Sequence, residues 1–126
     1  MSTDTMTPVG AKGSKAKTVA LWAVTGLLAC LFAFAGVLKF VSAEEAEQFA
    51  AWGYPDWFRV LIGAAEVAGG LGLLLPRTAS LAAAGLGVVM VGAVWTHLGH
   101  GEIPKASVPF VILGLLAAVA YFRRPW

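Results

Sequence analysis

The sequence predicts an all-α integral membrane protein: a bundle of four transmembrane helices, with a short amphipathic helix between the first two. Of its 126 residues, 59% are hydrophobic and only 13% are charged, whereas a soluble domain is about half apolar and a quarter charged. The apolar residues are gathered in four blocks, 18–41, 57–75, 78–98 and 106–122. A helix needs ~20 residues to cross the hydrocarbon of a bilayer. Three blocks meet this length, and the fourth does so if its helix begins near Ile103.

The first block, residues 18–41, follows a polar segment rich in Thr, Gly, Ser and Lys. Residues 1–17 have little apolar surface to bury and are predicted to form a disordered cytoplasmic tail. Residues 18–126 then form one domain. A cleavable signal peptide ending at Val41-Ser42-Ala43 is the alternative for this block. Its apolar run of about 23 residues is longer than the 7–15 of a typical signal peptide, which favours a retained helix.

Charged residues between the blocks predict the orientation. One set of segments, 1–17, the loop after the second block and the C-terminal end, carries the bases Lys12, Lys15, Lys17, Arg77, Arg123 and Arg124. The opposite segments carry most of the acids, Glu44, Glu45, Glu47, Asp56 and Glu102. The positive-inside rule then places both termini in the cytoplasm of a bacterial inner membrane. The net charge of +2 comes from these topological bases, so it gives no reason to expect a nucleic-acid partner.

The segment between the first two blocks predicts a short helix at the outer membrane interface. Ser42 followed by Glu45 is a capping-box pattern, after which Ala46, Phe49 and Ala50 share one helical face. Gly53 can end this helix and Pro55 can begin the next. The aromatic side chains are typical of an interfacial belt. The alternative is a lid over a space between the helices, formed by Phe49, Trp52, Tyr54 and Trp57.

Three polar residues lie within or at the ends of the apolar blocks, where polar groups are costly and usually face the bundle interior. They are Lys39, Glu66 and His97. Side chains tilt toward the N-terminus of their helix, so Lys39 and His97 lean into the membrane and Glu66 leans outward toward them. Each also has a simpler interpretation. Lys39 could extend its ammonium group to the interface, His97 could be an interfacial histidine, and Glu66 could be a structural carboxyl that bonds to the backbone. Pairing with Lys39 decides whether Glu66 is an anion or a proton carrier.

Other chemistries have little support in the sequence. The single cysteine, Cys30, cannot form an intramolecular disulfide or a CxxC redox centre. His97 and His100 with Glu102 are a weak alternative as a metal site, because they lie at a helix end without a closed ligand set. No metal centre is therefore predicted.

Several motifs resemble those of the DoxX-like family of small membrane proteins. These are "AGVLKF" at the end of the first block, "WGYPDWF" and "IGAAEVAGGLGLLLP" through the second, "MVGAVWTHL" in the third and "RRP" after the fourth. The resemblance covers residues 20–124 and implies a DoxX-like domain with four transmembrane helices. It also implies association with membrane redox or metalloenzyme-maturation systems. Lys39, Glu66 and His97 match polar positions of the family, but the resemblance implies no catalytic role for them.

The leading functional hypothesis is an accessory subunit of a quinone-linked membrane redox system. Lys39, Trp95 and His97 would donate hydrogen bonds to a quinone in the outer half of the bundle, and Glu66 would relay a proton. Whether the chain is an enzyme stays open; if so, it is an oxidoreductase subunit rather than a stand-alone enzyme. The alternatives are a small proton-coupled transporter and a non-catalytic membrane scaffold. Expected partners are membrane lipids and either a membrane or peripheral protein or a second copy of the chain.

Overall fold

The structure, a computed structural model, describes the backbone of residues 9–124 and the side chains of residues 15–124. These residues form five helices and no strand. The helices are α1 (Val9–Val41), α2 (Ala43–Ala51), α3 (Asp56–Leu73), α4 (Ala79–Gly99) and α5 (Ile103–Phe122). The predicted all-α class and the short helix after the first block are thus confirmed, and α5 begins at Ile103 as expected.

The first helix is longer than its apolar block. It begins at Val9, so residues 9–17 of the predicted tail are helical, and residues 1–8 lie outside the described part of the chain. Extending an existing helix adds one hydrogen bond for each residue fixed and avoids the cost of nucleation. Ala11, Ala16 and the lysines of this segment are good helix formers. A polar composition therefore did not prevent helix formation here.

Three of the four long helices are long and apolar enough to cross a membrane: Lys15–Val41 within α1, and all of α4 and α5. The helix α3 differs because its 18 residues include Asp56, Arg59 and Glu66. Many large apolar side chains on the described helices are exposed, among them Leu27, Phe34, Leu81 and Phe110. Such a surface is unfavourable in water and suits a lipid environment, in keeping with a membrane protein.

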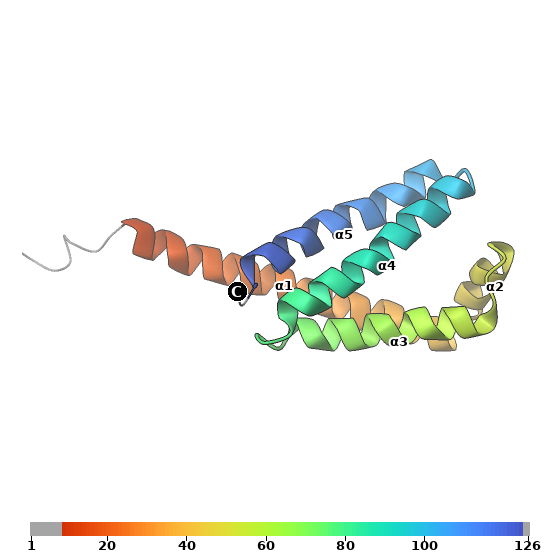
Figure 1. The fold of residues 1–126 in the computed structure, drawn as a ribbon, viewed down its shortest axis with the longest axis horizontal. Helices are drawn as coiled ribbons and strands as arrows, with labels where there is room; N and C mark the ends of the chain where they lie inside the picture. The colour runs from red at the N-terminus through yellow and green to blue at the C-terminus, as the bar shows by residue number, and fades with distance from the viewer. Residues whose placement is uncertain (1–8, 125–126) are drawn as a thin grey trace, which may run out of the picture.

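The long helices form two antiparallel pairs, α1 with α3 and α4 with α5, joined through contacts of α3 with α4 (Figure 1). The pairs lie close together near the turn between α3 and α4 and diverge toward the end that carries α2 (Figure 1). The buried core lies in the half where the pairs meet and consists of Leu28, Ala29, Phe32, Leu73, Ala83, Leu86, Met90, Leu116 and Val119. The helices are therefore sealed at one end of the bundle and separated at the other.

Glycines allow α1 and α3 to approach closely. A Cβ atom added to Gly36 would lie 2.6 Å from the backbone oxygen of Gly63, and one added to Gly70 would lie 2.9 Å from that of Ala29. Small residues permit such backbone contact between membrane helices. Gly36 lies three residues before Lys39, and Gly63 lies three residues before Glu66. The close crossing therefore brings these two charged residues to adjoining helical turns.

Candidate functional site

A cavity of about 690 Å³ lies at the end of the bundle where the helix pairs separate. Residues of α1, α2, α3 and α4 line it, together with Ser42, Trp52 and Tyr54 from the connections at the ends of α2. Its apolar lining is Leu38, Phe49, Phe58, Ile62, Val88, Val89, Met90 and Ala93, and its polar lining includes Lys39, Ser42, Glu44, Glu45, Gln48, Glu66, Thr96 and His97. The described structure thus encloses a space with mixed polar and apolar walls.

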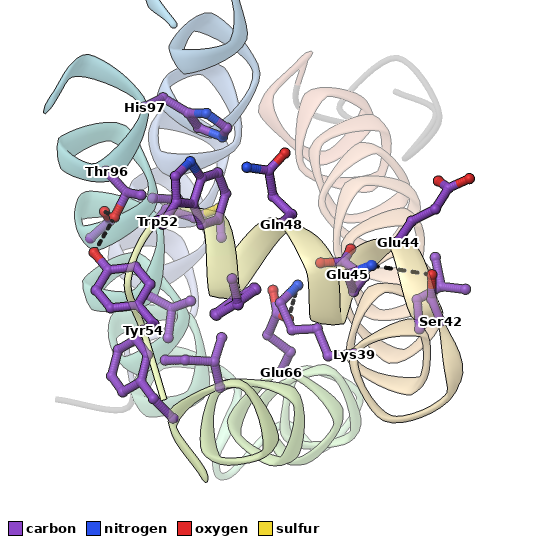
Figure 2. A pocket seen from close by; sticks show the side chains of 18 of the residues that line it. Lys39, Ser42, Glu44, Glu45, Gln48, Trp52, Tyr54, Glu66, Thr96 and His97 are labelled. Atoms are coloured by element: carbon purple, nitrogen blue, oxygen red, sulfur yellow. Dashed lines mark hydrogen bonds and ion pairs between the residues drawn. The ribbon is translucent and has the colours of Figure 1, made fainter. Parts of the chain in front are cut away.

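Lys39 and Glu66 meet in this cavity below α2 (Figure 2). The Lys39 Nζ atom lies 2.7 Å from Glu66 Oε1, and the two side chains are 12% and 4% exposed. Their contact is an ion pair rather than a well-aligned hydrogen bond. Neither side chain makes another hydrogen bond or ion pair among the described residues. An ammonium group has three donors, so Lys39 keeps donor capacity beside the cavity.

Arg59 fixes the end of α1 next to this ion pair. Its guanidinium donates to the backbone oxygen of Lys39 and forms an ion pair with Asp56 at 3.4 Å. The last carbonyl groups of a helix lack partners within the helix and favour a nearby cation. The sequence alone does not single out Arg59. Its cross-helix contact depends on the close approach of α1 and α3, which a single sequence does not display.

The helix α2 covers the cavity with a partly polar face. Ser42 caps it, accepting a hydrogen bond from the Glu45 backbone N–H at 3.4 Å, and Gly53 follows it with a φ of 88°. Both features agree with the predicted boundaries. The buried face differs from the prediction: Phe49 is buried, but Ala50 is exposed, and Glu45 and Gln48 line the cavity. Side chains of α2 therefore bring carboxylate and amide groups to the mouth of the cavity.

Three residues join the end of α2 to the connection between α4 and α5: Trp52, His97 and Glu102. We call these three residues the latch. Trp52 Nε1 donates to Glu102 Oε1 at 3.2 Å, and His97 Nδ1 lies 3.0 Å from the same oxygen. The Trp52 and His97 rings also meet edge to face, with centroids 5.3 Å apart. Nearby, the hydroxyls of Tyr54 and Thr96 are 2.7 Å apart (Figure 2). These contacts hold the two helix pairs together at their separated end.

The structure assembles only part of the predicted site. Lys39, Glu66 and His97 share the cavity, but His97 bonds to Glu102 instead of reaching the ion pair. Trp95 is 77% exposed and does not line the cavity. Among the lid candidates, Phe49, Trp52 and Tyr54 line it, whereas Trp57 is 67% exposed. Trp95 and Trp57 therefore lie where they can contact lipid, and neither faces a ligand in the cavity.

The weak metal alternative is also not assembled. His97 Nδ1 bonds to Glu102, whereas His100 Nδ1 lies 2.8 Å from the Thr96 backbone oxygen. No group of three or more His, Cys, Asp or Glu side chains in the described part of the chain is arranged to hold a metal ion. The polar groups of the cavity that the sequence did not predict are Ser42, Glu44, Glu45, Gln48 and Thr96, and Glu102 was not predicted as an acceptor in the latch.

Because the latch depends on the charge of Glu102, we expect the position of α2 over the cavity to depend on pH. Hydrogen bonding from His97, followed by that from Trp52 and the charge of Lys105, holds the pKa of Glu102 below its usual value of 4.5. A lowered folded-state pKa means that this stabilisation is complete above about pH 4.5 and is lost as the pH falls through the folded-state value. Spin labels at Glu47→Cys and Ile103→Cys, with Cys30→Ala, should give a narrow distance distribution at pH 7 and a broader, longer one once the pH falls below the folded-state pKa of Glu102.

Glu102→Ala should produce the broad distribution at every pH, because both Trp52 and His97 lose their acceptor. The control is Glu44→Ala, which removes an exposed acid of α2 that has no part in the latch. A Glu102→Ala protein with the narrow distance at pH 7 would show that Glu102 does not hold α2 in place.

These features define a class of protein: a helical membrane protein whose separated helix pairs enclose a cavity, with a buried ion pair beneath a short covering helix. The chain belongs to the DoxX-like family, whose family model matches residues 23–119. The matched segment contains every residue that lines the cavity. No curated protein and no solved structure matches the chain.

Proposed function

We propose that this DoxX-like protein is an accessory subunit of a membrane redox system, and that its cavity binds the head group of a quinone-type lipophile. The observation that carries the proposal is the buried Lys39–Glu66 ion pair within a largely apolar cavity. Its volume of about 690 Å³ falls in the range of ~300–1,000 Å³ common for small-molecule sites. The apolar side chains of the lining suit the ring and the start of a prenyl tail, and polar side chains among them, Lys39 and Glu66 in particular, can fix the orientation.

In this proposal each polar residue has a defined task. Lys39 donates a hydrogen bond to one carbonyl oxygen of the quinone, using a donor that Glu66 does not occupy. Glu66, paired with Lys39 as a carboxylate in the resting site, accepts a proton beside that oxygen and releases it again. Reduction of a quinone to a quinol takes two electrons and two protons, and a partner protein would supply the electrons. This division of labour is why we propose an accessory subunit and not a stand-alone oxidoreductase.

We further propose that α3 is a fourth membrane helix and that both termini lie in the cytoplasm. Its 18 residues span about 27 Å at 1.5 Å per residue, and it packs along α1. The charge of Glu66 is balanced by Lys39, while Asp56 and Arg59 lie at one end of the helix. Bases gather at the opposite end of the bundle, in Lys15, Lys17, Arg77, Arg123 and Arg124, which is the pattern of a cytoplasmic side.

A second candidate function, a small proton-coupled transporter, is favoured by the acidic mouth of the cavity. Glu44 and Glu45 line it without a cationic partner among the described residues, and the rings of Phe49, Trp52 and Tyr54 line the same cavity. Carboxylates next to aromatic faces suit a lipophilic cation. If neither kind of ligand binds, a non-catalytic scaffold that holds a partner at the membrane is the remaining function.

The test is to identify what the protein retains from its native membrane. The protein is purified in mild detergent, and the bound lipophiles are extracted and identified by mass spectrometry. We expect a prenyl quinone to be enriched over bulk lipid. Ile62→Trp, which fills the cavity without removing the ion pair, and Glu66→Gln should each lower the enrichment severalfold. Glu47→Gln, an exposed change on α2 outside the cavity lining, should not.

Each other outcome contradicts the quinone proposal in a distinct way. An enriched lipophilic cation that Ile62→Trp removes would support the transporter. No enriched lipophile in any of the four proteins would support the scaffold. A quinone retained equally by the wild-type protein and Ile62→Trp would place its binding outside the cavity.

A further inference from the structure

A second pocket lies at the basic end of the bundle. It shares no lining residue with the cavity described above. It has a volume of about 390 Å³ and is lined by Lys17 of α1 and by Tyr121, Phe122 and Arg124 at the end of α5. The acidic side chains that the structure describes belong to α2, α3 and the α4–α5 connection. Among the described residues, the pocket therefore combines two cations with two aromatic rings and no acid.

Aromatic rings of α5 hold both cations in place. Lys17 Nζ lies 4.5 Å from the centroid of the Phe122 ring, and the Arg124 guanidinium carbon lies 3.9 Å from that of Tyr121. Arg124 Nη1 also donates to the Tyr121 backbone oxygen at 2.6 Å. Cations are attracted to the faces of aromatic rings at such distances. Neither cation pairs with a carboxylate in the described part of the chain, so both positive charges remain available to a ligand.

Arg123, unlike Arg124, does not line the pocket but joins α5 to α1. Its guanidinium stacks on Trp22 at 3.9 Å, and its Nε donates to Thr25 Oγ1 at 3.2 Å. Thr25 is fully buried and in turn donates to the Leu21 backbone oxygen. Arg123 thus ties the end of α5 to α1, the two elements that supply the pocket walls. The pocket is consequently held between α1 and the end of α5 that Arg123 fastens to it.

We infer that this pocket binds the phosphate head group of an anionic membrane phospholipid. A phosphodiester accepts charge-assisted hydrogen bonds from guanidinium and ammonium groups, and basic pockets between membrane helices bind anionic lipid head groups. Tyr121 and Trp22 are aromatic residues of the kind that lie at the membrane interface, which is the depth of a lipid phosphate. The apolar surfaces of α1 and α5 beyond the pocket can accompany the acyl chains. This inference does not depend on what the cavity binds.

The test is native mass spectrometry of the full chain in detergent, titrated with phosphatidylglycerol or with phosphatidylcholine of the same acyl chains. We expect one phosphatidylglycerol to bind at concentrations at which phosphatidylcholine does not. A basic residue near an anionic lipid contributes about 1 kcal/mol, which is about fivefold in affinity. Lys17→Gln and Arg124→Gln should therefore each weaken the first binding step about fivefold, and together about 25-fold.

Lys15→Gln is the matched control. It makes the same charge change on the same helix, two residues from Lys17, and Lys15 does not line the pocket. Its affinity should stay within about twofold of the wild type. Equal weakening by Lys15→Gln and Lys17→Gln would overturn the site in favour of general charge attraction. Equal binding of the two lipids would also overturn it, and displacement of the lipid by millimolar inorganic phosphate would show a free-phosphate site instead.

Discussion

Lys39→Met and Glu66→Gln are each expected to lower the free energy of unfolding by about 3–5 kcal/mol, because each leaves the other partner as an unpaired polar group in a buried position. The two side chains are only 12% and 4% exposed, and neither has another polar partner among the described residues. Lys39 cannot reach water as an exposed lysine does without breaking this contact. Stability is measured by denaturant titration in mixed detergent micelles.

Matched controls separate this effect from a general change of charge. Lys105→Met and Glu47→Gln make the same two substitutions at exposed positions, where single changes usually alter stability by less than about 0.5 kcal/mol. Lys39→Met and Lys105→Met with equal effects would mean that Lys39 is solvated at the interface, as a snorkelling lysine would be.

The second large effect is expected for Gly36→Ala. The added Cβ would lie 2.6 Å from the Gly63 oxygen and 2.9 Å from the Val67 nitrogen, so α1 and α3 must separate. Overpacking of this kind costs about 1–3 kcal/mol and sometimes more. Separation of the helices should also lengthen the contact between Lys39 and Glu66, which lie one turn further along each helix.

Gly26→Ala is the control for this substitution. Gly26 is in the same helix, and an added Cβ would meet nothing within 4 Å. Replacing a helical glycine with alanine favours the helix by up to about 1 kcal/mol, so this variant should be as stable as the wild type or slightly more so. The pair is compared in the same micelle titration. Equal stabilities of Gly36→Ala and Gly26→Ala would contradict the close crossing of α1 and α3.

The sequence predicted the helical elements well where local chemistry sets them. Four apolar blocks correspond to the four long helices of the described residues, because a run of apolar residues buries backbone groups that must find partners and a helix supplies those partners within the segment. Ser42, Gly53 and Ile103 mark boundaries through capping, positive φ and the length that a span needs. The start of α1 differs from the prediction because the polarity of residues 9–17 predicts a tail, whereas these residues continue the helix of the apolar block.

The candidate site was predicted only in part, because the sequence does not determine how each helix is rotated about its own axis. Lys39 and Glu66 are charged within apolar surroundings, so each has a strong reason to face the interior and the other. The helix α4 is apolar almost all round, which leaves its orientation to packing. Successive residues of a helix point about 100° apart, so Thr96 and His97 reach the cavity while Trp95 does not.

The orientation of α2 follows from contacts with distant residues and not from its own amphipathic pattern. The pattern favoured burying Ala46, Phe49 and Ala50 together. The structure buries Phe49 and turns Glu45 and Gln48 toward the cavity, while Trp52 bonds to Glu102 and Tyr54 to Thr96. These partners lie 50 and 42 residues away in the chain. A single sequence contains no signal that identifies pairs at such separations.

The most direct test of the ion pair in the cavity is a measurement of the coupling free energy between Lys39 and Glu66. It is obtained by adding the double variant Lys39→Met/Glu66→Gln to the two single variants in the same titration. Because the double variant leaves no unpaired charge, we predict that it is more stable than either single variant. A double variant whose loss equals the sum of the two single losses within about 0.5 kcal/mol, as for independent sites, would show that the residues do not interact and would contradict the ion pair on which the proposed function depends.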